Sequence, residues 1–345
     1  MKISNNPKIL MLCVSYGRFG GTELGAERLR NWLVDNNIDV TVIANGNSDD
    51  VINVPVFLMP KLMWTVMAYF ISLWYVMFNR IDVIYSRYAT YPLFVGAVLK
   101  LITRKPLIVS IHGGDIRHGG LFKHLINLFM GYADRVVCYD NLEHIAELKK
   151  RGLSPIVIPN GIDARRFKPK KVDLKINKVI YAGGVREIKG FLDAVALASY
   201  SKFDGRDNLE FCLFSDGNIP GDSRTKFLFR VSHDKMEDIL ETGQLFILPS
   251  HAEGVPGALL EAMASGMYVI ASDLDFTRRA LDKRFLFKPK DIDSMAELII
   301  KFCDDKKGYF GDQNKKNREF VVKNYSIDNS GAKWKELILS LTKKA

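Results

Sequence analysis

Cysteine is scarce in this sequence, and metal-binding patterns are absent. The 345 residues contain four cysteines, at widely spaced positions, and no C-x-x-C pair. Three of the four lie in apolar, strand-like segments, which predicts reduced thiols in a hydrophobic core rather than a disulfide framework. No H-E-x-x-H motif or Cys/His cluster occurs either, so we expect no essential metal. Reduced cysteines are typical of a cytoplasmic protein.

Signals for nucleic-acid binding and for secretion are also lacking. The net charge is +10, but the basic residues are scattered, and no helix-turn-helix, RNA-binding or zinc-finger signature accompanies them. We therefore expect no nucleic-acid partner. No signal-peptide pattern opens the chain. Residues 1–169 hold 20 basic against 13 acidic residues, and this surplus suits an anionic surface or a phosphorylated substrate.

Long apolar runs are limited to one. Residues 62–78 are seventeen positions without a charge, between Lys61 and Arg80. As a helix they would be about 25 Å long, which is short of the roughly 30 Å hydrocarbon core of a bilayer. A strand begins soon after Arg80, so a wholly buried helix of an α/β layer is the favoured interpretation. A helix at a membrane interface through Trp64 and Trp74 and a transmembrane span are the alternatives.

What is present indicates a folded protein of two domains. The composition of 48% hydrophobic and 26% charged residues is that of a globular chain, and the length suits two domains of ordinary size. Short apolar strands alternate with helical segments, a pattern that predicts parallel sheets. The lysine-rich segment 168–178 is the predicted boundary. We expect domains at 1–169 and 170–325, with a last helix in 326–345 that crosses back to the first domain.

The richest candidate site lies in residues 245–272, which read as strand, loop, helix and strand. Ligands of open parallel sheets bind where such a loop leaves the strand. Gly254 and Gly257 allow a close backbone approach, and the N–H groups of the helix start can bind a phosphate. Glu253 and Glu261 are separated by seven residues, and sugar hydroxyls are their natural partners. An ordinary βαβ unit with two solvated acids is the alternative.

Four further segments carry polar residues or glycine turns beside predicted strands or helix starts. Gly183 and Gly184, with basic residues at the following helix start, have the chemistry of a diphosphate site. His112 follows a strand and is well placed for a ligand, although Asp115 could instead cap the next element. Two D-x-D sequences, at 273–275 and 291–293, resemble a metal motif; we interpret both as coincidental, because Asp is common as a cap.

The sequence E-G-V-P-G-A-L-L-E-A-M-A-S-G, which starts at Glu253, resembles the E-x7-E signature of retaining GT-B glycosyltransferases of family 4. Similar matches are Lys189-Gly190, the P-N-G-I-D at 159–163, the H-G-G-D at 112–115 and the glycine turn before Ala26-Glu27. The resemblance implies an α/β fold of two Rossmann-like, doubly wound domains that face a cleft. It also implies retaining transfer of a sugar from a nucleotide diphosphate-sugar to an acceptor hydroxyl.

The resemblance also assigns roles to residues. Glu261 would hold the ribose, and Glu253 the hydroxyls of the donor sugar. Glu253, His112 and Asp115 form the expected catalytic set. In the family an Arg stands where this chain has Gly184, so Arg186 is a displaced candidate for that guanidinium. The full set of expected donor-binding residues is Gly20, Gly21, Gly183, Gly184, Arg186, Lys189, Val255, Pro256, Gly257, Ala258, Leu259 and Glu261.

The expected partners are a UDP- or GDP-type donor and a saccharide or lipid-linked acceptor, in cell-envelope polysaccharide, lipopolysaccharide or glycolipid synthesis. A cytoplasmic location with peripheral contact to the inner face of the membrane would suit the basic, apolar first half. The alternatives are a GT-B-fold nucleotide-sugar epimerase and a non-catalytic nucleotide-sugar-binding partner. A glycosidase would need two opposed carboxylates, which Glu253 and Glu261 do not supply from one loop and one helix.

Overall fold

The computed structural model describes residues 6–16, 21–46, 51–54, 61–112, 115, 118–169, 177–215, 217, 224–229, 231–232 and 235–342. The chain forms two compact units, Met1–Gly161 with Ile327–Ala345 and Ile162–Ser326. The chain thus passes from the first unit to the second after Gly161, earlier than the expected boundary after residue 169. Ile162 already belongs to the second unit, where its N–H donates to the carbonyl of Tyr325 (2.9 Å). Most of the expected lysine-rich linker, residues 170–176, lies outside the described residues.

A parallel sheet of seven strands forms the centre of the first unit, in the order β3-β2-β1-β4-β5-β6-β7. Side chains of β1 alternate between the two faces, as the pleat requires: Ile9 and Met11 enter one core, and Leu10 and Leu12 the other. The strands are β1 Lys8–Ser15, β2 Asp39–Asn45, β3 Val51–Asn53, β4 Val83–Arg87, β5 Leu107–Ile111, β6 Arg135–Cys138 and β7 Ile156–Val157.

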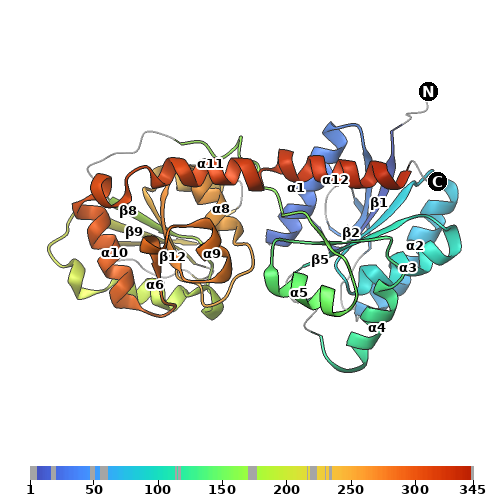
Figure 1. Ribbon diagram of the computed structural model, residues 1–345, viewed down its shortest axis with the longest axis horizontal. Coiled ribbons are helices and arrows are strands. Elements are labelled where there is room, and N and C mark those ends of the chain that lie inside the picture. The colour runs from blue at the N-terminus through green and yellow to red at the C-terminus, as the bar shows by residue number, and fades with distance from the viewer. Residues whose placement is uncertain are drawn as a thin grey trace. The chain divides into compact units, whose positions relative to one another are not determined.

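Helices cover both faces of this sheet (Figure 1). One core contains residues of α1 and α12, and the opposite core contains residues of α2, α3, α4 and α5. The last helix of the chain, α12, therefore belongs to the first unit. The bounds are α1 Gly21–Asp35, α2 Lys61–Phe78, α3 Tyr91–Thr103, α4 Gly120–Met130, α5 Leu142–Lys150 and α12 Ile327–Thr342.

The apolar run at residues 62–78 does form a helix, α2, but the expectation that it is wholly buried is wrong. Trp64 and Ala68 lie in the core of the first unit. Phe70 and Trp74, by contrast, are 63% and 61% exposed. Among the described residues, no helix combines the length and the hydropathy that a bilayer span requires.

The second unit repeats the architecture with a parallel sheet of six strands, in the order β10-β9-β8-β11-β12-β13. The central strands β11 and β12 are short and mainly apolar, as expected of strands that are covered on both faces. The strands of this sheet are β8 Asn177–Tyr181, β9 Leu209–Ser215, β10 Thr225–Phe229, β11 Leu245–Leu248, β12 Tyr268–Ser272 and β13 Leu286–Phe287.

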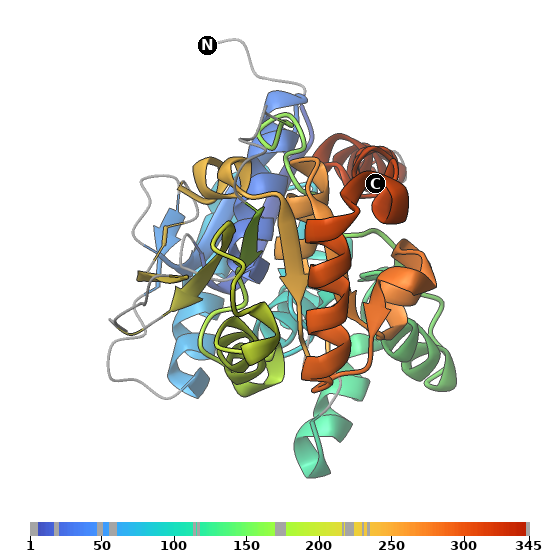
Figure 2. The ribbon, with the colours of Figure 1, turned by 90° about the vertical axis from the view of Figure 1, so that its left-hand side faces the viewer.

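Helices cover both faces of this sheet as well (Figure 1 and Figure 2), and each face has its own core. One contains residues of α6 and α10, and the other residues of α7, α8, α9 and α11. The doubly wound α/β fold expected for each half is confirmed. The helices are α6 Phe191–Ala198, α7 Met236–Thr242, α8 Gly257–Ala264, α9 Asp275–Ala280, α10 Ile292–Asp304 and α11 Gln313–Tyr325, with short turns η1 Glu187–Lys189, η2 Ser201–Phe203, η4 Lys283–Phe285 and η5 Lys306–Phe310.

The strand orders decide where ligands can bind. Each order reverses once, between β1 and β4 in the first sheet and between β8 and β11 in the second. Loops that leave two adjacent strands on opposite sides of such a switch point diverge, and they leave a crevice at the carboxyl ends of the strands. The predicted diphosphate turn follows β8, and the predicted E-x7-E segment follows β11. The second sheet therefore brings these two segments to one place.

Candidate functional site

The loops after β8 and β11 are held against each other in the second unit. The N–H of His251 donates to the carbonyl of Ile188 at 2.9 Å. Gly190 has a φ of +69°, and a Cβ at this position would overlap the carbonyl oxygen of Pro249. Only glycine fits both the backbone conformation and the close approach. Gly190 thus serves the packing of the two loops.

At this contact two of the charged residues predicted for the donor site meet. The Lys189 ammonium forms an ion pair with Oε1 of Glu253, and the Ser250 hydroxyl donates to the same oxygen at 3.1 Å. The side chains are 20% and 9% exposed, so solvent screens the pair only in part. An anionic group bound by Lys189 would compete with Glu253 and release its carboxylate.

A second pair, not predicted from the sequence, joins the same loops. Nε2 of His251 lies 2.6 Å from Oδ2 of Asp193, in the first turn of α6. This contact orients the loop that carries Glu253, because His251 is only two residues away. The sequence signal was a histidine directly after a strand and Pro249-Ser250, but its partner lies 58 residues earlier.

The start of α8 offers the predicted phosphate-binding amides. Pro256 is the residue before the helix. The first hydrogen bond of the helix runs from the N–H of Leu260 to the carbonyl of Pro256 (3.2 Å). The N–H groups of Gly257, Ala258 and Leu259 are therefore not used within the helix. Apart from the adjoining residues and the helix backbone, no atom of the described residues lies within 4 Å of the position a Cβ would take at Gly257, so this side of the helix start is open.

The other residues predicted around this helix differ in what they can contribute. Leu259 is buried in the core, so only its backbone can contact a ligand, and Pro256 has no N–H to donate. Val255 is half-buried and packs against the same core. Glu261 is only 4% exposed, so its carboxylate can reach only a ligand group that lies directly against it.

The glycine turn after β8 is shaped by Tyr181. The Tyr181 hydroxyl donates to the carbonyl of Gly184 at 2.8 Å, and a Cβ at Gly183 would overlap the Tyr181 ring. Gly184 has a φ of +69°, a conformation that favours glycine over the Arg of the family pattern. Arg186 is exposed and forms no ion pair with any residue that the structure describes.

In the first unit, His112 lies at the end of β5 inside a network of hydroxyl groups. Its Nε2 is 2.8 Å from the Ser110 hydroxyl and 3.0 Å from the Tyr139 hydroxyl. Its Nδ1 has no hydrogen-bond partner among the described residues. Burial, and then the charge of Arg87, lower the pKa of His112 well below its usual value. The imidazole is therefore neutral at pH 7.

Asp115 holds the backbone around His112. Its Oδ2 accepts the N–H groups of His112 and Ala89, both at 3.0 Å. Asp115 thus caps the turn that precedes it. Burial raises the pKa of the Asp115 carboxyl to about 6, against the lowering effects of these two hydrogen bonds and of Arg87. Gly113 and Gly114 lie outside the described residues.

The structure adds Arg87 and Tyr88, which the sequence did not single out. Arg87 is buried at the end of β4, where its guanidinium donates to the Tyr85 hydroxyl (3.3 Å) and to Oδ1 of Asn160 (3.4 Å). Tyr88 has a φ of 105°, a strained conformation of the kind that clusters at functional sites. Its ring centroid is 4.8 Å from that of His112. In the sequence, the position of Arg87 at the end of an apolar strand could have indicated a functional residue.

The raised pKa of Asp115 predicts a pH-dependent stability. Its folded value, about 6, exceeds the unfolded value, 3.8. The protonated Asp115 carboxyl therefore adds to the free energy of unfolding, and this stabilisation is fully present below about pH 4. It amounts to about 3 kcal/mol and is lost as the pH rises through about 6. Asn at this position keeps the acceptor oxygen but does not ionise. We expect the stability of Asp115→Asn, relative to the wild type, to rise by about this amount between pH 4 and pH 7.

Thermal unfolding of both proteins across this pH range measures the effect, because all other titrations cancel in the difference. A difference that stays constant with pH would contradict the assignment.

Some predicted residues stay outside the described part of the chain. Gly20 is one of them, and Gly21 is the first residue of α1.

The two D-x-D sequences act in caps and ion pairs. Asp291 accepts the N–H of Ser294 at the start of α10 (3.0 Å), and Asp293 accepts the Tyr200 hydroxyl (2.6 Å). Asp273 pairs with Arg278 at 2.6 Å. Within the described residues, no group of three or more His, Cys, Asp or Glu side chains is arranged to hold a metal ion.

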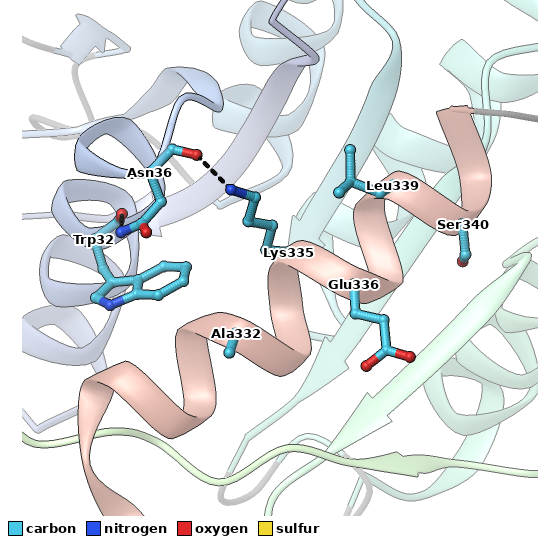
Figure 3. Close-up of a pocket in the computed structure, with 7 residues that line it drawn as sticks. All are labelled: Trp32, Asn36, Ala332, Lys335, Glu336, Leu339 and Ser340. Carbon is cyan, nitrogen blue, oxygen red and sulfur yellow. Dashed lines mark hydrogen bonds between the residues drawn. The ribbon is translucent and has the colours of Figure 1, made fainter.

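A surface pocket of 740 Å³ lies between α1 and α12 (Figure 3). Across it, the Lys335 ammonium donates to the carbonyl of Asn36 at 3.0 Å. None of the described residues predicted for the site lines it, so we assign it no part in the chemistry. Its lining residues are Trp32, Asn36, Ala332, Lys335, Glu336, Leu339 and Ser340.

Comparisons with known proteins bear on both units. The family model described as Glycosyltransferase Family 4 matches residues 19–166. The model described as Glycosyl transferases group 1 matches residues 221–324. The first match falls largely in the first unit and the second within the second unit. Together they cover more than half of the chain.

Two curated relatives share about a quarter of the aligned residues. An Escherichia coli protein named UDP-Gal:alpha-D-GlcNAc-diphosphoundecaprenol alpha-1,3-galactosyltransferase is 25% identical over 236 residues, with 60% of each chain covered. Bacillus subtilis TuaC, named a putative teichuronic acid biosynthesis glycosyltransferase, is 24% identical over 245 residues, with 64% of this chain and 61% of TuaC covered. The matches span about three fifths of the length of these relatives.

Among solved structures, Anabaena HepE in complex with UDP-glucose is similar over nearly the whole chain. The TM-score is 0.72 at 17% identity, and 96% of this chain and 99% of HepE are covered. This likeness shows the fold, and the expected architecture of two Rossmann-like domains of the GT-B type is confirmed.

Proposed function

Because the chain belongs to the family 4 glycosyltransferases of the GT-B type, we propose that it transfers a sugar from a nucleotide diphosphate-sugar to an acceptor hydroxyl. The observation that carries this proposal is the Lys189–Glu253 ion pair, which lies at the switch point of the second sheet. A cation that can bind a diphosphate and a carboxylate that can bind sugar hydroxyls are held together there.

Donor binding exchanges the partner of Lys189. The diphosphate brings more negative charge than a single carboxylate, so the ammonium turns from Glu253 to the phosphates. The N–H groups of Gly257, Ala258 and Leu259 add donors at the positive end of α8. Glu253 is then free to accept hydrogen bonds from the sugar, and Glu261 accepts those of the ribose hydroxyls. Phosphate recognition and sugar recognition are thereby coupled.

The bond that breaks joins C1 of the sugar to the diphosphate oxygen. Negative charge develops on the departing diphosphate, where Lys189 and the helix amides stabilise it without an essential metal. The acceptor oxygen bonds to C1 from the face that the diphosphate leaves, and its proton passes to a phosphate oxygen. This course retains the anomeric configuration.

Residues of the first unit serve hydroxyl recognition in this proposal. His112 is neutral at pH 7, because burial lowers its pKa, so it positions a hydroxyl group through a hydrogen bond and does not act as a cationic acid. Asp115 fixes the backbone of His112 through the two N–H groups that it accepts.

The donor and acceptor classes are supported by the compared proteins. HepE was solved with UDP-glucose, which favours a UDP-sugar over a GDP-sugar. The names of the Escherichia coli and Bacillus subtilis relatives refer to a diphosphoundecaprenol-linked acceptor and to teichuronic acid. We therefore favour a saccharide or lipid-linked acceptor in envelope polysaccharide or glycolipid synthesis. None of these three names describes an epimerase or a non-catalytic binder.

A thermal-shift screen of nucleoside diphosphates and their sugars tests the donor class. A bound nucleotide at 100 times its Kd adds about 2.7 kcal/mol of stability. Glu261→Ala removes the carboxylate that would bind the ribose, so we expect its nucleotide Kd to rise about 10- to 100-fold. Titration calorimetry with UDP measures this change.

Glu297→Ala, which removes an exposed acid of α10, is the matched control and should bind like the wild type. Unchanged affinity in Glu261→Ala would refute the ribose assignment. If no nucleotide stabilises the wild type, the donor class itself is refuted.

A further inference from the structure

Helix α2 presents an apolar row to solvent. The exposed residues follow helical spacing, so they share one side of the helix, while Trp64 and Ala68 pack into the core on the other side. Met77 and Phe78, at the end of the row, are each 70% exposed. The complete row is Met63, Val66, Phe70, Trp74, Met77 and Phe78.

The neighbouring helices of the same layer extend this apolar surface. Helices α2, α3 and α4 all pack on one face of the first sheet, and Phe94 of α3 meets Phe122 of α4 at a ring distance of 5.7 Å. Leu101 and Ile102 at the end of α3 are exposed, as are Leu121, Leu125 and Leu128 on α4. These residues and the α2 row constitute what we term the α2–α4 surface. So many exposed apolar residues on adjacent helices indicate an interaction surface.

Charge distinguishes the kind of partner. Residues 51–133 contain eight Lys and Arg but only two acids, Asp82 and Asp115. Asp115 is buried, and Asp82 pairs with Arg80 at 3.1 Å. The sequences of α2, α3 and α4 contain no acid at all. Lys100 and Lys123 pair with Asp134 (2.6 Å) and Glu147 (3.9 Å), whereas Arg104 and Lys105, which follow the exposed Leu101 and Ile102, form no ion pair with a described residue. The surface therefore combines apolar side chains with a surplus of positive charge.

We propose that the α2–α4 surface docks onto an anionic lipid bilayer. Trp, Phe, Met and Leu side chains of in-plane helices enter the boundary between headgroups and acyl chains, and nearby Lys and Arg side chains bind the anionic headgroups. A second copy of this chain fits less well, because two such surfaces would bring their surplus positive charges together. Since neither nucleotide nor sugar takes part, this inference does not depend on the proposed reaction.

Co-sedimentation with vesicles tests the docking. We expect the full chain to bind vesicles of equal parts phosphatidylglycerol and phosphatidylcholine, to bind pure phosphatidylcholine at least about tenfold more weakly, and to lose anionic binding at high salt. The double variant Phe70→Glu/Trp74→Glu places two carboxylates within the α2 row. It should lower the partition coefficient between vesicles and water by about tenfold or more.

Val34→Glu/Val322→Glu is the matched control. These valines are 41% and 40% exposed on α1 and α11, so the control adds the same charge outside the surface and should bind like the wild type. Equal vesicle binding by all three proteins would overturn the proposal. So would a wild type that ignores the vesicles but forms a dimer that Phe70→Glu/Trp74→Glu dissociates, since the occupant would then be a second copy.

Discussion

Glu253→Gln should lower kcat by roughly 10²- to 10³-fold while UDP binds at least as tightly as in the wild type. In the structure, the Glu253 carboxylate is the partner of Lys189. Glutamine preserves the shape but cannot neutralise the ammonium, so UDP meets a stronger positive charge and its Kd should fall about two- to tenfold. Turnover falls because an amide accepts hydrogen bonds from the donor sugar more weakly than a carboxylate does.

Calorimetry with UDP and steady-state kinetics with the UDP-sugar found in the screen measure the two effects separately. Glu187→Gln is the control, because it removes the same charge from an exposed residue of η1 in the adjoining loop. An unaltered kcat in Glu253→Gln would show that Glu253 does not hold the sugar. Weaker UDP binding would show that the carboxylate does not compete with the phosphates.

Lys189→Met should weaken UDP binding about 100-fold. Two effects act in the same direction. The diphosphate loses its ammonium partner, and the largely buried Glu253 carboxylate is left facing the phosphates, where like charges repel. Calorimetry measures the Kd. Lys315→Met removes an exposed lysine of α11 whose side chain is 74% accessible, and this control should bind UDP like the wild type.

The double variant Lys189→Met/Glu253→Gln separates the two effects. If repulsion from the unpaired Glu253 carboxylate contributes, Glu253→Gln should tighten UDP binding by a larger factor in the Lys189→Met background than in the wild-type background, so the two changes are not additive. Strict additivity would contradict the exchange of partners. UDP affinity that Lys189→Met does not change would remove Lys189 from the donor site.

The Lys189–Glu253 pair explains why the site was only partly predictable. Each residue lies in a loop that can be recognised along the chain, the first after a glycine turn and the second before a helix start. Their contact spans 64 residues and depends on the adjacency of β8 and β11, which are not consecutive strands. Strand order is a property of the sheet, and local patterns do not contain it.

The apolar helix α2 shows a different kind of limit. A uniformly apolar stretch predicts burial because apolar side chains favour the core. With no charged positions between Lys61 and Arg80 to mark an outward side, the sequence could not indicate that Phe70 and Trp74 face solvent while Trp64 is buried.

Arg87 illustrates a third limit, because its role depends on partners from distant segments. The hydroxyl of Tyr85 and the amide of Asn160 reach it only in the folded first unit. Similarly, the raised pKa of Asp115 follows from burial, which no local motif expresses.

From the sequence alone came the alternation of strands and helices, the two parallel sheets and the segments that carry donor-binding chemistry, because periodicity, glycine turns and helix starts are local properties of a chain. The tertiary structure alone decided which of these segments meet, which charges neutralise one another and which apolar side chains remain in contact with water. Those outcomes depend on strand order and on packing between residues far apart in the chain, where burial and Coulomb interactions act through space.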